Sequence, residues 1–231
     1  MAGLVIAAAC ALAYAGARQT SVFAVREIVV TGVPPRAAAE VRAALRPLDG
    51  QSLVGLRPDD VVRRATALPR VESVTYDRAF PHTLRVVVEP ERPLAVLRSG
   101  SESWLVSRTA RVIARLPRGG HPALPRIWKP ASTEVNVGAT LAPGDGAAEV
   151  AALAPLRSVG MAGRVATVKI AGGQIAYVLR GGLEVRAGRG RDLPLKLTIA
   201  RRILAQTRVA GYLDVSVPER PVGGVNSQLS G

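Results

Sequence analysis

Hydrophobic and polar positions in the first third of the chain follow a pattern that predicts a compact α+β unit. β-Branched residues gather in three short stretches, and apolar residues recur at helical spacing in two stretches between the first and second of these. The predicted elements are a strand at 25–31, helices at 34–48 and 58–68, and strands at 71–78 and 83–89. Both helices begin at prolines, which are favoured in the first helical turn. The order β-α-α-β-β packs two helices against one face of a small sheet.

The rest of the sequence predicts a larger unit built of short antiparallel strands. These strands are expected at 94–97, 104–106, 111–114, 165–170, 175–179 and 183–186. A proline-rich stretch at 117–130 is expected to be an irregular connection, and 146–157 has a weak helical pattern. A helix that begins around 192–194 and a closing strand from Tyr212 complete the pattern. The predicted fold class is therefore α+β.

The chain opens with an uncharged run, Met1 to Ala17, that ends at Arg18. As a helix this run is about 25 Å long at ~1.5 Å per residue, close to the roughly 30 Å hydrocarbon core of a bilayer. We expect a transmembrane anchor at 1–20 and place the remainder outside the cytoplasm. A cleaved signal peptide and a buried core helix are the alternatives. The one cysteine, Cys10, lies in this run, so no intramolecular disulfide is expected.

The net charge of +14 comes almost entirely from arginine. We expect a basic surface in the C-terminal part, formed by Arg189, Arg191, Lys196, Arg201 and Arg202. Lys196 falls within the apolar arc of its predicted helix, so its ammonium is expected to reach water along the protein surface. Nucleic acid, an anionic envelope surface or solvent alone could face this charge. The low aromatic content of 3% and the expected extracytoplasmic placement argue against nucleic acid.

No residue pattern predicts an enzyme. The two histidines, His82 and His121, have no carboxylate or second histidine at ligand spacing, so we expect no metal site. The sequence has no Gly-x-Ser-x-Gly elbow, no phosphate-binding loop and no carboxylate pair placed for acid–base work. We therefore expect a non-catalytic protein without cofactor, metal or small-molecule substrate.

Two stretches of the chain contain motifs that are typical of one bacterial protein family. The first runs from LPRV at Leu68 through YDRAFPHTLRVVVEPERPLAVL to Leu97, and contains the family's Phe-Pro-x-Thr-Leu turn. It is preceded by VREIVVTG, which is similar to the opening strand of a polypeptide-transport-associated (POTRA) domain. The second stretch, GGLEVRAGRGRDLPLKLTIARRILAQT followed by GYLDVSVPERPVGG, resembles the family's Gly-Arg-Gly turn, lysine-containing helix and closing strand. The family that both stretches resemble is the bacterial cell-division family FtsQ/DivIB.

The resemblance implies a domain organisation and a role. The segments would be an anchor or signal at 1–20, a POTRA domain at 22–91, an FtsQ-type β domain at 92–225 and a tail at 226–231. The protein would be a single-pass component of the inner or plasma membrane at the division septum. It would bind divisome membrane proteins, FtsB/DivIC-like and FtsL-like, and no nucleic acid.

The resemblance also implies where these partners bind. They would add a strand to the family's closing strand, which here comprises Tyr212, Leu213, Asp214, Val215, Ser216, Val217 and Pro218. Pro218 would end the pairing because it has no N–H to donate. The alternative is a POTRA-containing membrane protein of export or envelope assembly, because the POTRA fold alone does not identify a function.

Overall fold

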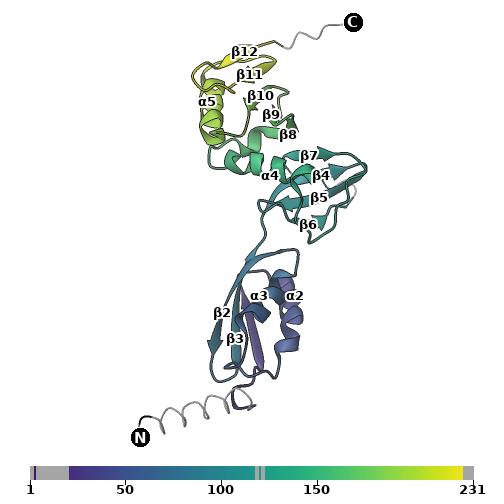
Figure 1. Ribbon diagram of the computed structural model, residues 1–231, viewed down its shortest axis with the longest axis vertical. Helices are drawn as coiled ribbons and strands as arrows, with labels where there is room; N and C mark the ends of the chain where they lie inside the picture. Colours follow the sequence, from purple (N-terminus) through teal and green to yellow (C-terminus); the bar gives the residue numbers. More distant parts are fainter. Residues whose placement is uncertain (1–2, 4–20, 118–119, 121–122, 226–231) are drawn as a thin grey trace. The chain divides into compact units, whose positions relative to one another are not determined.

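The computed structural model describes residues 3, 21–117, 120 and 123–225. The chain divides into two compact units, Met1–Glu91 and Arg92–Gly231, which are treated separately (Figure 1). The anchor predicted at 1–20 (apart from Gly3), His121 and the tail at 226–231 lie outside the described residues. In the part of the chain that is described, no helix has the length and apolar character needed to cross a membrane.

The first unit has the predicted β-α-α-β-β order. Its elements are the 3-10 turn η1 (Ser21–Phe23), β1 (Glu27–Thr31), α2 (Pro35–Leu45), the 3-10 extension η2 (Arg46–Leu48), α3 (Pro58–Thr66), β2 (Val71–Ala79) and β3 (Thr83–Pro90). β3 is the central strand, parallel to β1 and antiparallel to β2. Leu84, Val86 and Val88 of β3 are buried while Arg85 is exposed, as the alternation predicts. The inward residues of both helices complete this core.

The second unit contains one nine-stranded sheet in the order β12-β11-β10-β9-β8-β7-β4-β5-β6. The strands are β4 (Pro93–Ser99), β5 (Glu102–Ser107), β6 (Val112–Arg115), β7 (Arg126–Lys129), β8 (Val165–Ala171), β9 (Gln174–Leu179), β10 (Glu184–Gly188), β11 (Tyr212–Asp214) and β12 (Val222–Gly224). The helical segments are η3 (Pro143–Asp145), α4 (Ala147–Leu153), η4 (Ala154–Leu156), η5 (Ala162–Arg164) and α5 (Leu193–Gln206). The two helices and the sheet enclose a single apolar core.

The sheet is mixed, which corrects the prediction of an antiparallel domain. Three neighbouring pairs are parallel, namely β4 with β7, β7 with β8, and β10 with β11. The β10–β11 pair is parallel because α5 crosses over between the two strands, as in a β-α-β unit. The four-residue strand β7 lies within 117–130, where we expected an irregular connection; only Ile127 of its residues is buried, so its apolar signal is weak.

The join between β7 and β8 is the narrowest point of this sheet. Their register consists of one residue pair, Arg126 with Thr167. The Thr167 hydroxyl also donates a hydrogen bond to the Arg126 carbonyl at 2.7 Å. Helix α4 packs against both β4 and β8 and therefore bridges the two parts of the sheet.

Candidate docking edge of the second unit

The C-terminal edge of the nine-stranded sheet is formed by β12, not by the predicted closing strand. β11 (Tyr212–Asp214) lies between β10 and β12 and is paired on both sides. The sequence pattern did not reveal β12, because it is three residues long and contains two glycines next to Pro221. Within the described residues, no strand lies beyond β12.

The residues that follow β11 are also engaged within the unit. Val215 is buried, and its amide donates to the carbonyl of Arg186 at 2.8 Å. The Ser216 amide donates to Asp214 Oδ1 at 2.8 Å. Val217 is exposed and Pro218 is half-buried. The structure thus separates the predicted docking residues into a paired strand, Tyr212–Asp214, and a following segment outside the sheet.

Hydrogen bonds to β10 give the direction of the β11 backbone groups. The Val215 amide bonds to Arg186, and the Glu184 amide donates to the Gly211 carbonyl at 3.1 Å. Backbone groups of successive strand residues point alternately to the two sides of the strand. Odd-numbered residues of β11 therefore direct their amides and carbonyls at β10, and even-numbered residues direct theirs at β12.

The same alternation identifies the free backbone groups of β12. The register places Val222 opposite Asp214 and Gly224 opposite Tyr212. Val222 and Gly224 therefore direct their backbone groups at β11. Gly223 lies between them and directs its N–H and C=O away from the sheet. Among the described residues, no strand pairs with this outward side of Gly223. It can accept a further strand.

The two glycines of β12 have different surroundings. A Cβ on Gly224 would lie 2.9 Å from the ring of Tyr212, so this ring covers the backbone of β12 and would have to move to admit a side chain there. The Tyr212 ring in turn stacks on the Arg186 guanidinium, 4.2 Å from its centroid. A hydrogen bond from Arg186 to Glu184, 2.6 Å long, raises the pKa of the guanidinium. These side chains brace the outer strands from one face of the sheet.

A groove adjoins the opposite face of the edge. Its volume is about 570 Å³, and it is lined by the C-terminal part of α5, the β9–β10 turn and the segment leading to β11. A Cβ on Gly223 would lie 3.3 Å from Val209, one of the lining residues. Of the described residues that line the groove, three are arginines, Arg164, Arg180 and Arg208, and none is acidic. The groove therefore combines apolar walls with positive charge, and its rim at Val209 adjoins β12.

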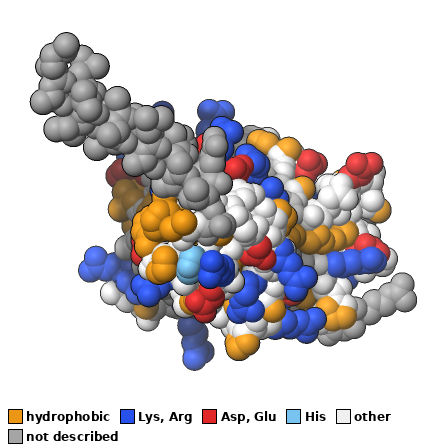
Figure 2. All heavy atoms as spheres, turned by 90° about the horizontal axis from the view of Figure 1, so that it is seen from below, with side chains coloured by type: hydrophobic (Ala, Val, Ile, Leu, Met, Phe, Trp, Pro, Cys, Tyr) orange, Lys and Arg blue, Asp and Glu red, His pale blue; other side chains and the backbone are white. Residues whose placement is uncertain are grey.

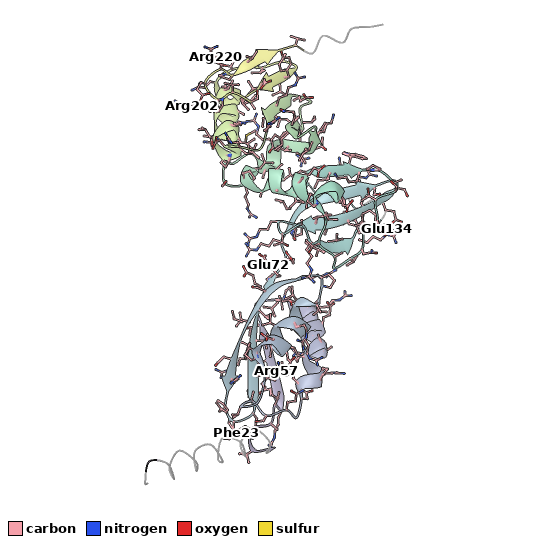
Figure 3. The ribbon with its side chains drawn as sticks, viewed as in Figure 1. Phe23, Arg57, Glu72, Glu134, Arg202 and Arg220 are labelled. Atoms are coloured by element: carbon pink, nitrogen blue, oxygen red, sulfur yellow. The ribbon has the colours of Figure 1, made fainter. Side chains whose placement is uncertain are left out.

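The predicted basic surface is present in part. Arg189, Arg191, Arg201 and Arg202 are exposed, and Figure 3 labels Arg202 on α5. Lys196 is only 6% exposed, and its ammonium donates 3.0 Å hydrogen bonds to the carbonyls of Ala187 and Arg189. The prediction that Lys196 reaches water was wrong, because the turn after β10 brings two carbonyls over the inner side of α5.

The described residues include no group of three or more His, Cys, Asp or Glu side chains that could hold a metal ion. His82 instead has a structural contact, with Nδ1 3.1 Å from the carbonyl oxygen of Ala24. This contact joins the β2–β3 turn of the first unit to the segment before β1.

Comparisons with known proteins first identify the class of the first unit. Residues 23–91 match the family model described as POTRA domain, FtsQ-type. The first unit is therefore an FtsQ-type POTRA domain, as the order of its elements indicates.

Two curated proteins are similar to nearly half of the chain. The cell division protein FtsQ of Rhizobium meliloti (strain 1021) is 32% identical over 104 residues, which cover 45% of this chain and 33% of that protein. FtsQ of Agrobacterium fabrum (strain C58 / ATCC 33970) is 33% identical over 104 residues, covering 45% of this chain and 32% of that protein. The chain is thus a distant homologue of FtsQ over 45% of its length, and the similarity spans about a third of each relative.

Proposed function

We propose that this chain is a non-catalytic divisome scaffold of the FtsQ type. Residues 1–20 would anchor it in the inner or plasma membrane, and the POTRA domain and the second unit would lie outside the cytoplasm at the division septum. Both relatives carry a cell-division name, which supports division over the export alternative. Its partners would be small bitopic proteins of the FtsB/DivIC-like and FtsL-like classes.

The observation that carries this proposal is the free backbone edge of β12. A partner strand beside β12 would meet the N–H and C=O of Gly223 and the neighbouring groups of Pro221 and Val225. About four backbone hydrogen bonds at a net ~0.5–1.5 kcal/mol each give roughly 2–6 kcal/mol. Micromolar binding needs about 8 kcal/mol. Strand addition alone is therefore too weak, and side-chain contacts must supply the rest.

The groove beside β12 supplies these contacts. Residues directly opposite each other in neighbouring strands project on the same face of a sheet. The Cβ position of Gly223 faces Val209, so a partner side chain opposite Gly223 would also face the Val209 rim of the groove. The three groove arginines favour an acidic residue nearby. The proposed partner segment is consequently an extended strand with apolar and acidic side chains on one face.

Gly223→Pro tests the docking edge, with Gly223→Ala as the matched control. The proline removes the outward N–H and fills its place, whereas pairing to β11 uses Val222 and Gly224. Alanine keeps the N–H and adds a Cβ 3.3 Å from Val209, which a shift of a few tenths of an ångström in the Val209 side chain accommodates. The full chain in nanodiscs would be titrated with the extracytoplasmic segments of the FtsB/DivIC-like and FtsL-like proteins of the same genome.

We expect Gly223→Pro to weaken binding by about tenfold or more, at ~1.4 kcal/mol per decade, and Gly223→Ala to bind nearly as the parent does. Circular dichroism and the melting temperature would establish that both variants are folded. A folded proline variant that binds as tightly as the parent would refute docking at β12. In dividing cells, a fluorescent fusion of the parent should collect at midcell.

Arg208→Glu tests the groove separately, with Arg202→Glu as control. Both changes reverse one exposed charge near the end of α5, but only Arg208 lines the groove. We expect Arg208→Glu to weaken the same interaction more strongly at low salt than at high salt. Equal losses for the two variants would show that the groove has no specific role.

A further inference from the structure

One end of the POTRA domain presents an exposed apolar surface, formed by η1 and the β2–β3 turn. Val22 is 60% exposed and Phe80 is 55% exposed. The rings of Phe23 and Phe80 are in edge-to-face contact, with centroids 5.4 Å apart. The chain has only two phenylalanines, and both lie here. Figure 3 labels Phe23 at this end of the domain, and the space-filling view from below shows hydrophobic side chains gathered there (Figures 2 and 3).

This surface is held in place by the backbone. The Phe23 carbonyl accepts a hydrogen bond from the Leu53 amide at 2.8 Å. The His82 carbonyl accepts one from the Arg26 amide at 2.9 Å, and the His82 ring contacts the Ala24 carbonyl. The segment before β1 and the β2–β3 turn are therefore fixed to each other. We call this surface, formed by Val22, Phe23 and Phe80, the platform; the backbone hydrogen bonds hold its side chains in fixed positions.

The sequence restricts what can cover this platform. The uncharged run ends at Ala17, five residues before Val22. Even a fully extended chain advances at most about 3.6 Å per residue, so Val22 lies within about 18 Å of the end of that run. If the run crosses a bilayer, the platform is confined near the headgroup layer, where exposed aromatic and aliphatic side chains are stabilised.

We propose that Val22, Phe23 and Phe80 form a membrane foot that inserts into the interfacial layer of the lipid bilayer. This inference rests on the proposed anchor at 1–20 and is independent of docking at β12. The foot would fix the POTRA domain against the membrane surface, so that the anchor and the domain do not move independently.

The charges around the foot indicate which lipids it needs. The charged residues nearest the foot in the sequence are three basic and two acidic ones, Arg18, Arg26, Arg78, Glu27 and Asp77. Arg78 donates a hydrogen bond to the Leu56 carbonyl, and Glu27 accepts one from the Thr83 hydroxyl. The excess of one positive charge gives only a weak attraction to anionic headgroups. Contact should therefore depend on apolar insertion and be insensitive to salt and to anionic lipid.

The test uses the full chain with Cys10→Ser, reconstituted in phosphatidylcholine vesicles. An environment-sensitive fluorophore is attached through Phe80→Cys, or through Val87→Cys as the matched control. Val87 is similarly exposed, at 51%, but lies in the middle of β3. Val87 lies four residue steps along β3 from Thr83, or about 13 Å at ~3.3 Å per residue. Lipids brominated in the acyl chain report insertion, and aqueous iodide reports exposure to water.

We expect brominated lipid to quench the label at 80 several-fold more than the label at 87, with the reverse order for iodide. Adding phosphatidylglycerol or 0.5 M salt (roughly a 4 Å screening length) should leave this difference unchanged. A label at 80 that iodide reaches freely would overturn the foot. Protection from iodide without quenching by brominated lipid would also overturn it, since protein, including a second copy, would then cover the site. Failure of the full chain to float with vesicles would refute the proposed anchor as well as the foot. Docking at β12 is tested separately, by the binding titration of the Gly223 variants.

Discussion

Removal of Lys129 should strongly destabilise the second unit. Its ammonium lies 2.7 Å from Glu149 Oε1 and donates a 2.8 Å hydrogen bond to the Gly144 carbonyl. The two side chains are only 12% and 8% exposed. The other carboxylate oxygen, Glu149 Oε2, is buried and has no hydrogen-bond partner among the described residues. The carboxylate of Glu149 therefore depends on Lys129, and the pair fastens α4 to the end of β7.

The size of the effect follows from burial. Removing one partner of a buried ion pair leaves an uncompensated charge and costs about 3–5 kcal/mol. A domain has a total stability of roughly 5–15 kcal/mol, so this loss is a large fraction of it. The second unit has 140 residues (Arg92–Gly231), for which a loss of this size lowers the melting temperature by roughly 10–20 °C. Replacing both residues, as Lys129→Met with Glu149→Leu, should restore stability to within about 1 kcal/mol of the parent or above it.

The assay is guanidinium unfolding followed by tryptophan fluorescence, which reports on the second unit because both tryptophans, Trp104 and Trp128, lie there. Arg115→Met is the control. It breaks the ion pair with Glu102, whose side chains are 62% and 40% exposed, and should cost at most about 1 kcal/mol. If Lys129→Met shifts the unfolding midpoint no more than Arg115→Met does, the reasoning from burial is wrong.

Two further predictions concern buried polar groups. Tyr177 is fully buried and donates a 2.7 Å hydrogen bond to the Ala152 carbonyl, so Tyr177→Phe should cost about 1–2 kcal/mol in chemical unfolding. Burial raises the pKa of Tyr177 well above its ordinary value of 10, so the proton stays on in the folded state. The contribution of protonated Tyr177 to stability is therefore full below pH 10 and is lost as the pH rises further. Absorbance at alkaline pH should show that Tyr177 ionises only when the protein unfolds. Ionisation of Tyr177 in the folded protein near pH 10 would contradict this prediction. Lys196→Met leaves the carbonyls of Ala187 and Arg189 without their donor and should cost about 2–4 kcal/mol, whereas an unchanged melting temperature would indicate that other groups satisfy them.

The POTRA domain could be predicted from sequence because its signals are local. Helical periodicity, a proline at each helix start and strict alternation over β3 lie within single elements. The buried set Leu84, Val86 and Val88 follows directly from that alternation. The match of 23–91 to the FtsQ-type POTRA domain agrees with this interpretation.

The second unit was predicted less well because its decisive features depend on distant residues. Whether Lys196 is buried is decided by the carbonyls of Ala187 and Arg189, which the turn at Gly188 (φ +65°) brings toward α5. The outer position of β12 depends on its pairing with β11, and its three residues have no pattern of their own. Only Tyr212–Asp214 of the predicted Tyr212–Pro218 strand form a strand after α5, and the free edge lies one strand further out.

The single residue pair between β7 and β8 has a mechanical consequence. A docked partner that pulls on β12 would load the strands in series, from β12 through β8 and then into β7. The strands on the docking side are joined by several residue pairs at each step, whereas Arg126 and Thr167 are the one pair at the join. A sheet under tension is weakest where the fewest residue pairs connect neighbouring strands, and α4 packs across this point. Because this pair alone gives the join little resistance to tension, the join depends on α4 and on the apolar core that both parts of the sheet share.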